Sequence, residues 1–137
     1  MSENLNSCPF CAPLEDRVFW RGRFCFAIWD NFPVNPGHAL IIPYRHVQDW
    51  FSATDHERRA LARATYSVRE IVMQQFPANG WNIGVNVGET GGQTVFHLHV
   101  HLIPRLTGDV ADPRGGVRGV IPDRKSYECS DQQVAKE

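Results

Sequence analysis

The chain has 137 residues, of which 42% are hydrophobic and 21% are charged, which suits one compact domain with a single core. Its net charge of -1 excludes the basic excess with which DNA-binding modules hold phosphates, so we expect no nucleic acid partner. The sequence contains neither an apolar run of the ~20 residues that span a membrane nor a basic and apolar secretion signal, and we expect a cytoplasmic protein without a membrane partner.

Residues 1–16 are expected to form an N-terminal segment of irregular structure. Prolines interrupt this mostly polar stretch, which contains the sequence CPFC at 8–11. Beyond it, the aromatic and aliphatic residues of 24–29 predict a strand. A proline-rich turn separates this strand from a second one at 39–43. The second run is continuously apolar, so we expect it to be buried on both faces of a sheet.

One long amphipathic helix is predicted over 55–75. Thr54 followed three positions later by Glu57 is typical of a capping box, in which each of the two residues satisfies a main-chain N–H group of the other. Apolar residues then recur at steps of three and four, as they do on one face of a helix. Pro77 and Gly80 are expected to end the helix.

Two further strands are predicted, at 81–88 and 94–104, because apolar residues alternate with other residue types in both stretches. Strands that cluster around one helix without βαβ alternation indicate an α+β domain with an antiparallel sheet. We expect this core to span 17–105. Residues 106–137 lose all periodicity and are expected to form a C-terminal arm and tail.

The sequence HLHVHL contains three histidines at every second position. Side chains alternate across a strand, so His97, His99 and His101 are expected to share one face, with an apolar residue after each pointing into the core. A solvated face, a metal site and a catalytic site are the three interpretations. At ~3.3 Å per residue the outer two histidines are about 13 Å apart, too far for one tetrahedral ion to bind all three.

Nucleophilic catalysis is the interpretation that uses the neighbouring residues. A neutral imidazole can attack phosphorus if its other nitrogen is protonated and held by an acceptor, and if donors surround the phosphate oxygens. The loop ETGGQT supplies such donors, namely the main-chain N–H groups at Gly91 and Gly92, the Gln93 amide and the Thr94 hydroxyl.

The stretch GGQTVFHLHVHLIPR at 91–105 resembles the signature of the histidine triad (HIT) nucleotide hydrolases and transferases. The similarity extends to FPVNPGHALIIPYRHV at 32–47 and VNVGETGGQ at 86–93. GQTV and IPR on either side of the histidines are more similar to the bacterial diadenosine tetraphosphate hydrolases and fragile histidine triad proteins than to the phosphoramidases. The resemblance implies a HIT-like antiparallel sheet of about five strands with one long helix and a short one.

The resemblance also implies catalytic roles for five residues. His99 would attack the α-phosphorus and become a nucleotidyl-histidine. His101 would contact the phosphate or bridging oxygen and help the leaving group depart, and His38 would hydrogen-bond within the triad. Thr94 would assist the leaving group, and Gln93 would contact the phosphates.

Substrate-binding residues are implied in the same way. The phosphates would be contacted by Asn86, Gly92, Gln93 and His101, and Asp30 would meet the ribose hydroxyls. The loop carries Glu89 and no lysine, so a divalent ion carried by the substrate would help to neutralise the phosphate charge. Arg105, Arg114 and Arg118 are candidate contacts for the outer phosphates. The arm at 112–122 would either close over the substrate or pack on a second subunit.

The CPFC sequence is a modest metal signal, and a redox pair is the alternative. Several HIT proteins that this sequence resembles carry a structural zinc ion bound by two such cysteines, a histidine after the second strand and the first triad histidine. The corresponding residues here are Cys8, Cys11, His46 and His97. In this arrangement the other two triad histidines remain available for phosphorus.

The expected function is hydrolysis of a dinucleoside polyphosphate at the α-phosphate, by a homodimer that the resemblance implies. The alternatives are nucleotidyl transfer to phosphate, cleavage of a P–N bond, and nucleotide binding without catalysis.

Overall fold

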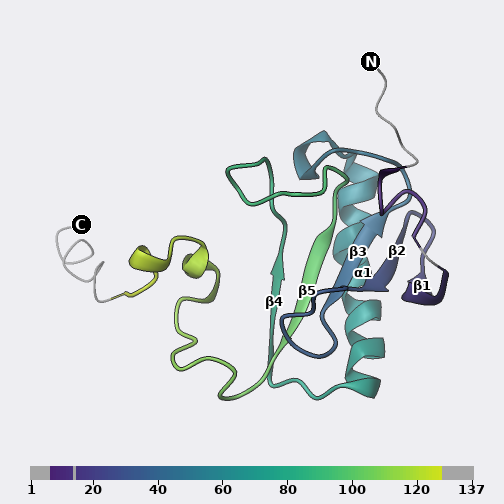
Figure 1. The fold of residues 1–137 in the computed structure, drawn as a ribbon. Helices are drawn as coiled ribbons and strands as arrows, with labels where there is room; N and C mark the ends of the chain where they lie inside the picture. Colours follow the sequence, from purple (N-terminus) through teal and green to yellow (C-terminus); the bar gives the residue numbers. More distant parts are fainter. Residues whose placement is uncertain (1–6, 14, 128–137) are drawn as a thin grey trace. The chain divides into compact units, whose positions relative to one another are not determined.

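A computed structural model describes residues 7–13 and 15–127, and the remaining parts of the expected N-terminal segment and C-terminal tail lie outside the described residues. The chain forms two compact units, the first ending at Arg105 and the second beginning at Leu106. The first unit contains one antiparallel sheet of five strands in the order β1-β2-β3-β5-β4 (Figure 1). The strands are β1 (Val18–Arg21), β2 (Cys25–Trp29), β3 (Ala39–Pro43), β4 (Gly80–Gly84) and β5 (Val100–Arg105).

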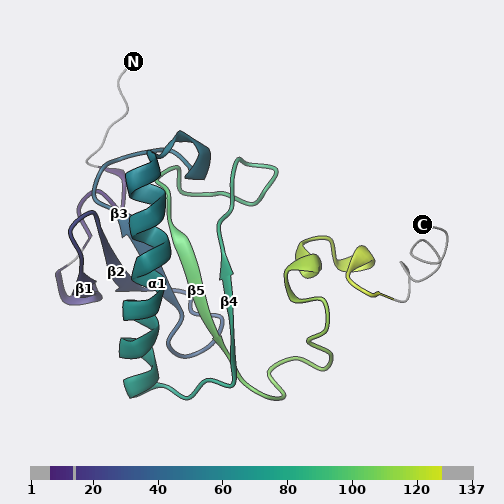
Figure 2. The same cartoon turned by 180° about the vertical axis from the view of Figure 1, so that it is seen from behind.

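The long helix is α1 (Asp55–Gln75), which agrees with the predicted range. Thr54 and Glu57 form the capping box, because the Thr54 side chain accepts from the Glu57 N–H and the Glu57 carboxylate accepts from the Thr54 N–H. A capping box of this kind satisfies main-chain donors that have no partner inside the helix. Helix α1 covers one face of the sheet, as the view from behind shows (Figure 2).

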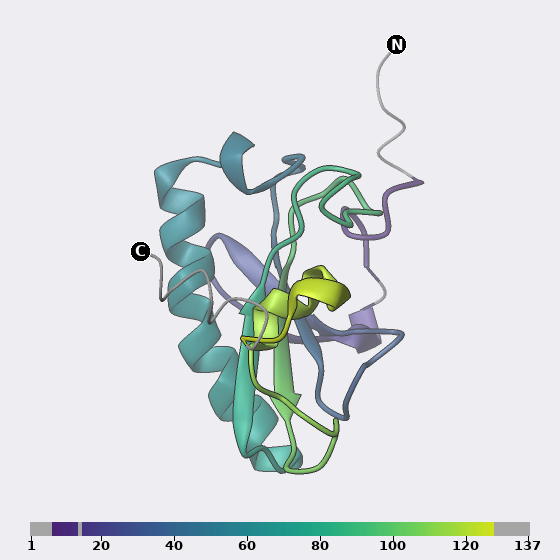
Figure 3. The same ribbon diagram turned by 90° about the vertical axis from the view of Figure 1, so that its left-hand side faces the viewer.

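The two faces of the sheet carry different clusters of buried side chains. Between the sheet and α1, the core contains Ile41, Leu61, Val68 and Leu102, all with 0% exposure. On the other face, the N-terminal loop packs on the sheet (Figure 3). The buried residues of this second cluster are Phe10, Phe26, Ile28, Leu40 and Ile42. Strand β3 contributes to both clusters and is buried along its whole length, as predicted.

Two predicted strands are shorter than expected. The strand predicted at 81–88 ends at Gly84, and the one predicted at 94–104 begins only at Val100. The ladder between β3 and β5 begins at the pair Ile41 and Val100. Two residues further along β3 is Pro43, which has no N–H group to donate to a ladder. The chain before Val100 instead bonds to the loop after β3, where the Leu98 N–H donates to the Val47 carbonyl at 2.8 Å.

The described short helices are single 3-10 turns. Three of the four are Trp50–Ser52 in the first unit and Gly116–Val120 and Pro122–Arg124 in the second. Arg118 holds the second unit together by donating to the main-chain carbonyls of Arg124 and Lys125. Within the described ranges, the helices are all too short or too polar to cross a bilayer.

Candidate active site and metal centre

The three histidines lie on the face of the sheet that α1 does not cover. Leu98, Val100 and Leu102 belong to the core under α1, so the expected alternation holds although the regular strand begins at Val100. His101 lies opposite Leu40 in the ladder, and residues in that position share a face of the sheet. The face therefore combines imidazoles with the apolar cluster around Leu40.

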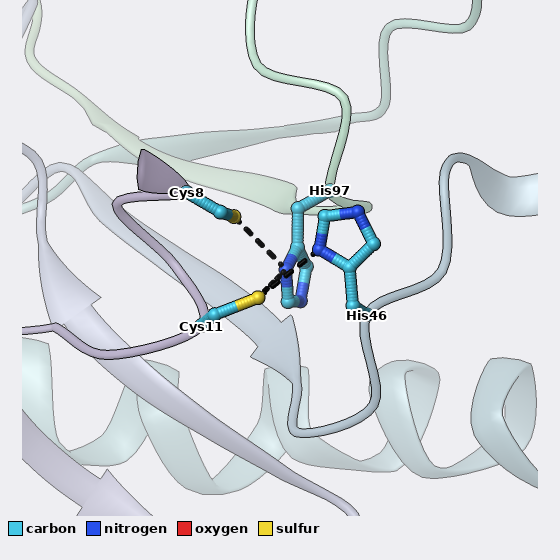
Figure 4. Close-up of side chains that lie close together, drawn as sticks. All are labelled: Cys8, Cys11, His46 and His97. Carbon is cyan, nitrogen blue, oxygen red and sulfur yellow. Dashed lines mark hydrogen bonds between the residues drawn. The ribbon is translucent and has the colours of Figure 1, made fainter. Parts of the chain in front are cut away.

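Cys8, Cys11, His46 and His97 gather at one end of this face, and we call them the Cys–His cluster (Figure 4). Cys8 Sγ lies 3.4 Å from His97 Nδ1, and Cys11 Sγ lies 3.1 Å from His46 Nδ1 and 3.6 Å from His97 Nδ1. The four ligand atoms all lie within 4.8 Å of one another. The structure thus brings together all four residues that the resemblance implies as metal ligands.

The geometry of the Cys–His cluster fits a tetrahedral ion. An ion bound at about 2.3 Å from sulfur and about 2.0 Å from nitrogen places neighbouring ligand atoms roughly 3.3 to 3.8 Å apart. The observed separations are close to this range. His97 Nε2 donates to the Pro43 carbonyl at 2.9 Å, so Nδ1 keeps its lone pair on the side of the sulfurs. This second hydrogen bond is the arrangement that orients a metal-binding histidine. The cluster can therefore hold a metal ion.

His99 is 9% exposed and has its two ring nitrogens in different environments. A carbonyl oxygen only accepts, so Nδ1 must carry the proton that it donates to the main-chain oxygen of His97, at 2.8 Å. Burial lowers the pKa of His99 and favours the neutral ring, in which Nε2 has a free lone pair. The edge of the Phe10 ring packs against His99, with centroids 4.9 Å apart. These are the properties of a nucleophilic imidazole.

Asp30, His38 and His101 form a second group, which we call the Asp–His cluster. His38 Nδ1 accepts from the Val34 N–H at 3.1 Å, so the proton of the neutral ring must lie on Nε2. That nitrogen lies 3.0 Å from His101 Nδ1 and 3.3 Å from the Asp30 carboxylate. Burial lowers the pKa of His38 below its usual value, which favours this neutral form.

The tautomer of His38 makes the Asp–His cluster unlike a metal centre, although its three potential ligand atoms lie close together. A protonated Nε2 cannot bind a cation through that nitrogen. Burial, together with the neighbouring His99 and His38, lowers the pKa of His101 to about 4. With His101 Nδ1 accepting from His38, the proton of the neutral His101 ring lies on Nε2, where it can donate to a substrate oxygen.

Gln93 has a position that the resemblance did not lead us to expect. Its side chain is 2% exposed, and its amide is used within the loop. Its oxygen accepts from the Gly88 N–H at 2.9 Å, and its nitrogen donates to the carbonyls of Gln48 and Val95 at 2.7 and 3.1 Å. Gln93 thus supports the glycine loop from inside the protein.

The remaining expected residues are distributed as follows. Asp30 also accepts from the Phe32 N–H through its other oxygen, at 2.9 Å, which fixes the turn after β2. Asn86 lies beside Gly92, because a Cβ built on this glycine would be 3.8 Å from the Asn86 side chain. Gly92 has a φ of 96°, in the left-handed region that glycine adopts most easily. Thr94 is exposed on the same loop.

The arginines expected to reach outer phosphates have partners inside the protein. Arg105 donates to the Asn82 side chain at 2.7 Å, and Arg114 pairs with Asp112 at 2.9 Å. Sequence reasoning did not identify Phe10 as a wall beside His99. Its place between the two cysteines of CPFC was the available signal, because a loop whose ends bind the metal centre must bring its middle residue close to it.

Comparison with known proteins agrees with this geometry. The family model described as "HIT domain" matches residues 13–108. The chain is 36% identical over 96 residues to the AP-4-A phosphorylase of Mycobacterium tuberculosis, a match that covers 69% of this chain and 49% of that protein. It is also 36% identical over 100 residues to the asymmetrical bis(5'-nucleosyl)-tetraphosphatase of Schizosaccharomyces pombe, covering 73% and 55%. The chain thus spans about half the length of these curated relatives.

A solved structure, that of a Zn-bound histidine triad family protein from Mycobacterium smegmatis, superimposes with a TM-score of 0.69 at 26% identity. The match covers 93% of this chain and 100% of that one. The match of the family model over most of the chain and the level of identity to curated relatives show that this chain belongs to the HIT domain family.

Proposed function

We propose that the protein is a nucleotide hydrolase that cleaves dinucleoside polyphosphates at the α-phosphate through a nucleotidyl-histidine. The observation that carries the proposal is the state of His99, whose Nδ1 proton is held by the main-chain oxygen of His97 while Nε2 is free. Curated relatives named AP-4-A phosphorylase and bis(5'-nucleosyl)-tetraphosphatase support dinucleoside polyphosphates as the substrate class.

In the first step, His99 Nε2 forms a bond to the α-phosphorus as the bond from phosphorus to the bridging oxygen breaks. The leaving nucleotide departs as an anion, and the His101 Nε2–H donates a hydrogen bond to the bridging oxygen. The phosphorylated ring of His99 is cationic, because Nδ1 keeps its proton. In the second step, water attacks phosphorus, the P–N bond breaks, and the water's proton is released with the nucleoside monophosphate. The first step needs both rings neutral beforehand, as the lowered pKa values of His99 and His101 favour.

Positioning of the phosphates is assigned to the side chains of Asn86 and Thr94. The main-chain N–H groups of Gly91 and Gly92, which the sequence suggested as donors, already donate to the carbonyls of Gly88 and Glu89, at 3.1 and 3.0 Å. Asp30 remains the candidate for the ribose hydroxyls, since a carboxylate accepts from two neighbouring hydroxyl groups. Because Gln93 uses its amide inside the loop, we assign it the role of shaping the phosphate site. A divalent ion carried by the substrate would offset the charge of the phosphate chain.

The test of this reaction is to trap the intermediate. Incubation with a dinucleoside tetraphosphate labelled at the α-phosphate should leave acid-labile label on the protein after rapid quenching. The variants His99→Ala and His99→Gln should bind the substrate and acquire no label. If both variants are labelled as strongly as the native protein, His99 is not the nucleophile.

Transfer to inorganic phosphate is the second candidate reaction, because a relative is named a phosphorylase. Both reactions share the first step and differ in the acceptor of the second. Product analysis with and without inorganic phosphate separates them, since transfer would yield a nucleoside diphosphate from the labelled half. A nucleoside phosphoramidate tested in the same assay measures cleavage of a P–N bond.

We further propose that the Cys–His cluster binds zinc with a structural role. Two thiolates and two imidazoles fill a tetrahedral shell and leave no position for a substrate. The ion would tie the N-terminal loop to His97 and thereby fix the carbonyl that orients His99. Metal analysis of the purified protein should give about one zinc per chain, and Cys11→Ser should remove it.

The protein is further proposed to be a homodimer. Strand β4 lies at the edge of the sheet, so its outer main-chain groups are free to pair with a second strand. Next to it is a cavity of about 700 Å³ with a mostly apolar lining, to which α1, β4 and the segment after β4 contribute. Tyr66 and Ile83 in this lining are 77% and 53% exposed. A two-fold axis would place the same surface of both copies together. Sedimentation should show a dimer for the native chain and a monomer for Ile83→Asp.

A further inference from the structure

A second cavity, of about 450 Å³, lies between the β1–β2 hairpin and α1. It is on the helix side of the sheet, because Cys25, which belongs to the core under α1, forms part of its lining. The catalytic histidines are on the opposite face. The proposed reaction therefore makes no use of this cavity, whose size is within the range of small-molecule sites.

The lining of this cavity is cationic. It contains Arg23 from the hairpin and Arg59 and Arg63 from α1, together with His56, and no aspartate or glutamate. Arg59 and Arg63 are four positions apart, so their side chains are neighbours on the helix surface. None of the three arginines forms an ion pair with any residue that the structure describes.

Other arginines close in sequence behave differently. Arg45 binds the Glu57 carboxylate through two nitrogens, at 2.7 and 2.9 Å, and Arg58 pairs with Asp55 at 2.6 Å. The acidic residues at the start of α1 are therefore already paired outside the cavity. A chain with a net charge of -1 nevertheless concentrates three arginines without counter-charges around one hollow. The three side chains are exposed, so water screens most of their mutual repulsion, and an anion can bind among them without displacing an ion-pair partner.

Aromatic rings complete the cavity. Trp20 and Phe24 are part of its wall, and Phe24 stacks on His56 with the ring centroids 6.4 Å apart and an angle of 21° between the planes. Phe24 is 40% exposed, and the Arg23 guanidinium lies over its ring, 5.1 Å from the centroid. At the floor of the cavity, burial raises the pKa of the Cys25 thiol to about 11, so sulfur adds no negative charge. Guanidinium groups beside aromatic rings suit a phosphate chain attached to a flat nucleobase.

We propose that this cavity is a second anion site, separate from the histidines, which binds the phosphate chain of a nucleotide or another small polyphosphate. Arg59 and Arg63 hold the phosphate oxygens as forked donors, and Arg23 closes the site from the hairpin. The base of a nucleotide lies against Phe24. The cavity performs no bond-breaking step, and its role is to bind a phosphorylated ligand at a distance from the catalytic face.

The test uses two-dimensional amide NMR of the full chain, which reports both faces of the sheet at once. Pyrophosphate, ADP and adenosine are titrated separately. Pyrophosphate and ADP should shift the amides of Gly22 and Ala60 at the cavity, with ADP the tighter ligand if the base contributes. Adenosine alone should leave these amides unshifted at the same concentrations. Shifts at Gly91 and Gly92 report the histidine face independently.

Matched variants identify the site. Arg63→Gln should raise the Kd measured at the cavity amides about tenfold, since each charge-assisted bond contributes on that scale. Arg69→Gln is the control, because it makes the same change in charge on the same helix without lining the cavity. The double variant Arg59→Gln with Arg63→Gln should abolish the shifts at Gly22 and Ala60 and leave those at Gly91 unchanged.

Two outcomes overturn the proposal. One is that no ligand shifts the cavity amides at millimolar concentrations, and the other is that Arg69→Gln weakens binding as much as Arg63→Gln. The proposal is independent of the catalytic one, because a protein that never forms a nucleotidyl-histidine can still show the cavity shifts. Equally, hydrolysis by His99 can persist in the double variant.

Discussion

Two clusters rich in imidazole adjoin His99, and they differ in what their ring nitrogens can do. In the Cys–His cluster, His97 donates its Nε2 proton to the Pro43 carbonyl, and the lone pair of Nδ1 faces the sulfurs. In the Asp–His cluster, His38 accepts from the Val34 N–H and turns a proton toward its neighbours. One main-chain group on the far side of each ring thus determines whether the ring presents a lone pair or a proton to its cluster.

The position of His99 between these clusters connects them. Its Nδ1 bonds to the main chain of His97, a residue of the Cys–His cluster, and its ring contacts that of His101 in the Asp–His cluster, with centroids 5.2 Å apart. If the two clusters have separate tasks, a change in the Asp–His cluster should alter kcat and leave the metal content unchanged. A change in the Cys–His cluster should remove the metal. The expected effects below are ordered from the largest to the smallest.

Replacement of His99 should separate chemistry from metal binding. In His99→Ala, kcat for a dinucleoside tetraphosphate should fall by a factor on the order of 10⁴ or more, because the attacking atom is removed. The zinc content should stay that of the native chain, since His99 is not a ligand. Loss of both properties together would mean that the two clusters form one site.

Removal of a proposed metal ligand should mainly lower the stability of the fold. Cys8→Ser should release the ion and lower the free energy of unfolding by roughly 3 kcal/mol or more, because metal binding contributes to folding. Denaturant titration with parallel metal analysis measures both. Ala12→Ser, in the same loop, makes a similar change outside the cluster and should alter neither. An unchanged metal content in Cys8→Ser would exclude this cluster as the binding site.

Replacement of His38 tests the role of the Asp–His cluster. His38→Ala removes the N–H that orients His101, so kcat should fall roughly 10- to 100-fold with little change in KM. Zinc content should remain native. His38→Gln, whose side-chain N–H matches the position of the histidine Nε2, should recover part of the loss. A fall in zinc content here would show that the Asp–His cluster also binds metal.

The pH dependence should show that the catalytic rings stay neutral in mildly acidic solution. An ordinary histidine gains a proton near pH 6.5, but burial lowers the pKa of His99 and lowers that of His101 to about 4. The value of kcat/KM should therefore hold as the pH falls through 6.5 and decline, about tenfold per pH unit, only below the lowered pKa. Zinc content measured at each pH separates ring protonation from metal release. A decline that begins at pH 7 contradicts the expectation.

Phe10 should give the smallest effect, because its ring packs on His97 and His99 without a hydrogen bond to either. Phe10→Leu keeps an apolar side chain at this buried position but removes the ring edge that packs on His99. We expect kcat to fall by about three- to fivefold with zinc content unchanged. Val95→Leu, at the margin of the same apolar cluster, is the control and should leave kcat as it is.

Local sequence patterns were sufficient for the long helix, for four of the five strands and for part of the site, whereas the count of about five strands came from the family resemblance. Thr54 and Glu57 marked the start of α1, because a capping box depends on residues three positions apart. The alternation around His99 placed the three imidazoles opposite the core for the same local reason. The end of β4 at Gly84 was missed, since the alternation continues to residue 88 where no strand pairs with it.

The role of Gln93 was beyond local reasoning. Its place next to the glycines suggested a phosphate contact, but its amide bonds to the Gln48 carbonyl, 45 positions earlier in the chain. Phe10 was missed although its place between the two cysteines was a signal, because its contact with His99 joins segments that are far apart in the chain.

The sequence by itself determined the strand and helix periods, the row of histidines and the pair of cysteines, because these depend on spacing along the chain. Only the tertiary structure decided which groups face each imidazole nitrogen. Cys8 and His97 are 89 positions apart, and His38 and His101 are 63 apart. The state of each ring depends on the partner of its second nitrogen, and folding alone brings those partners into contact.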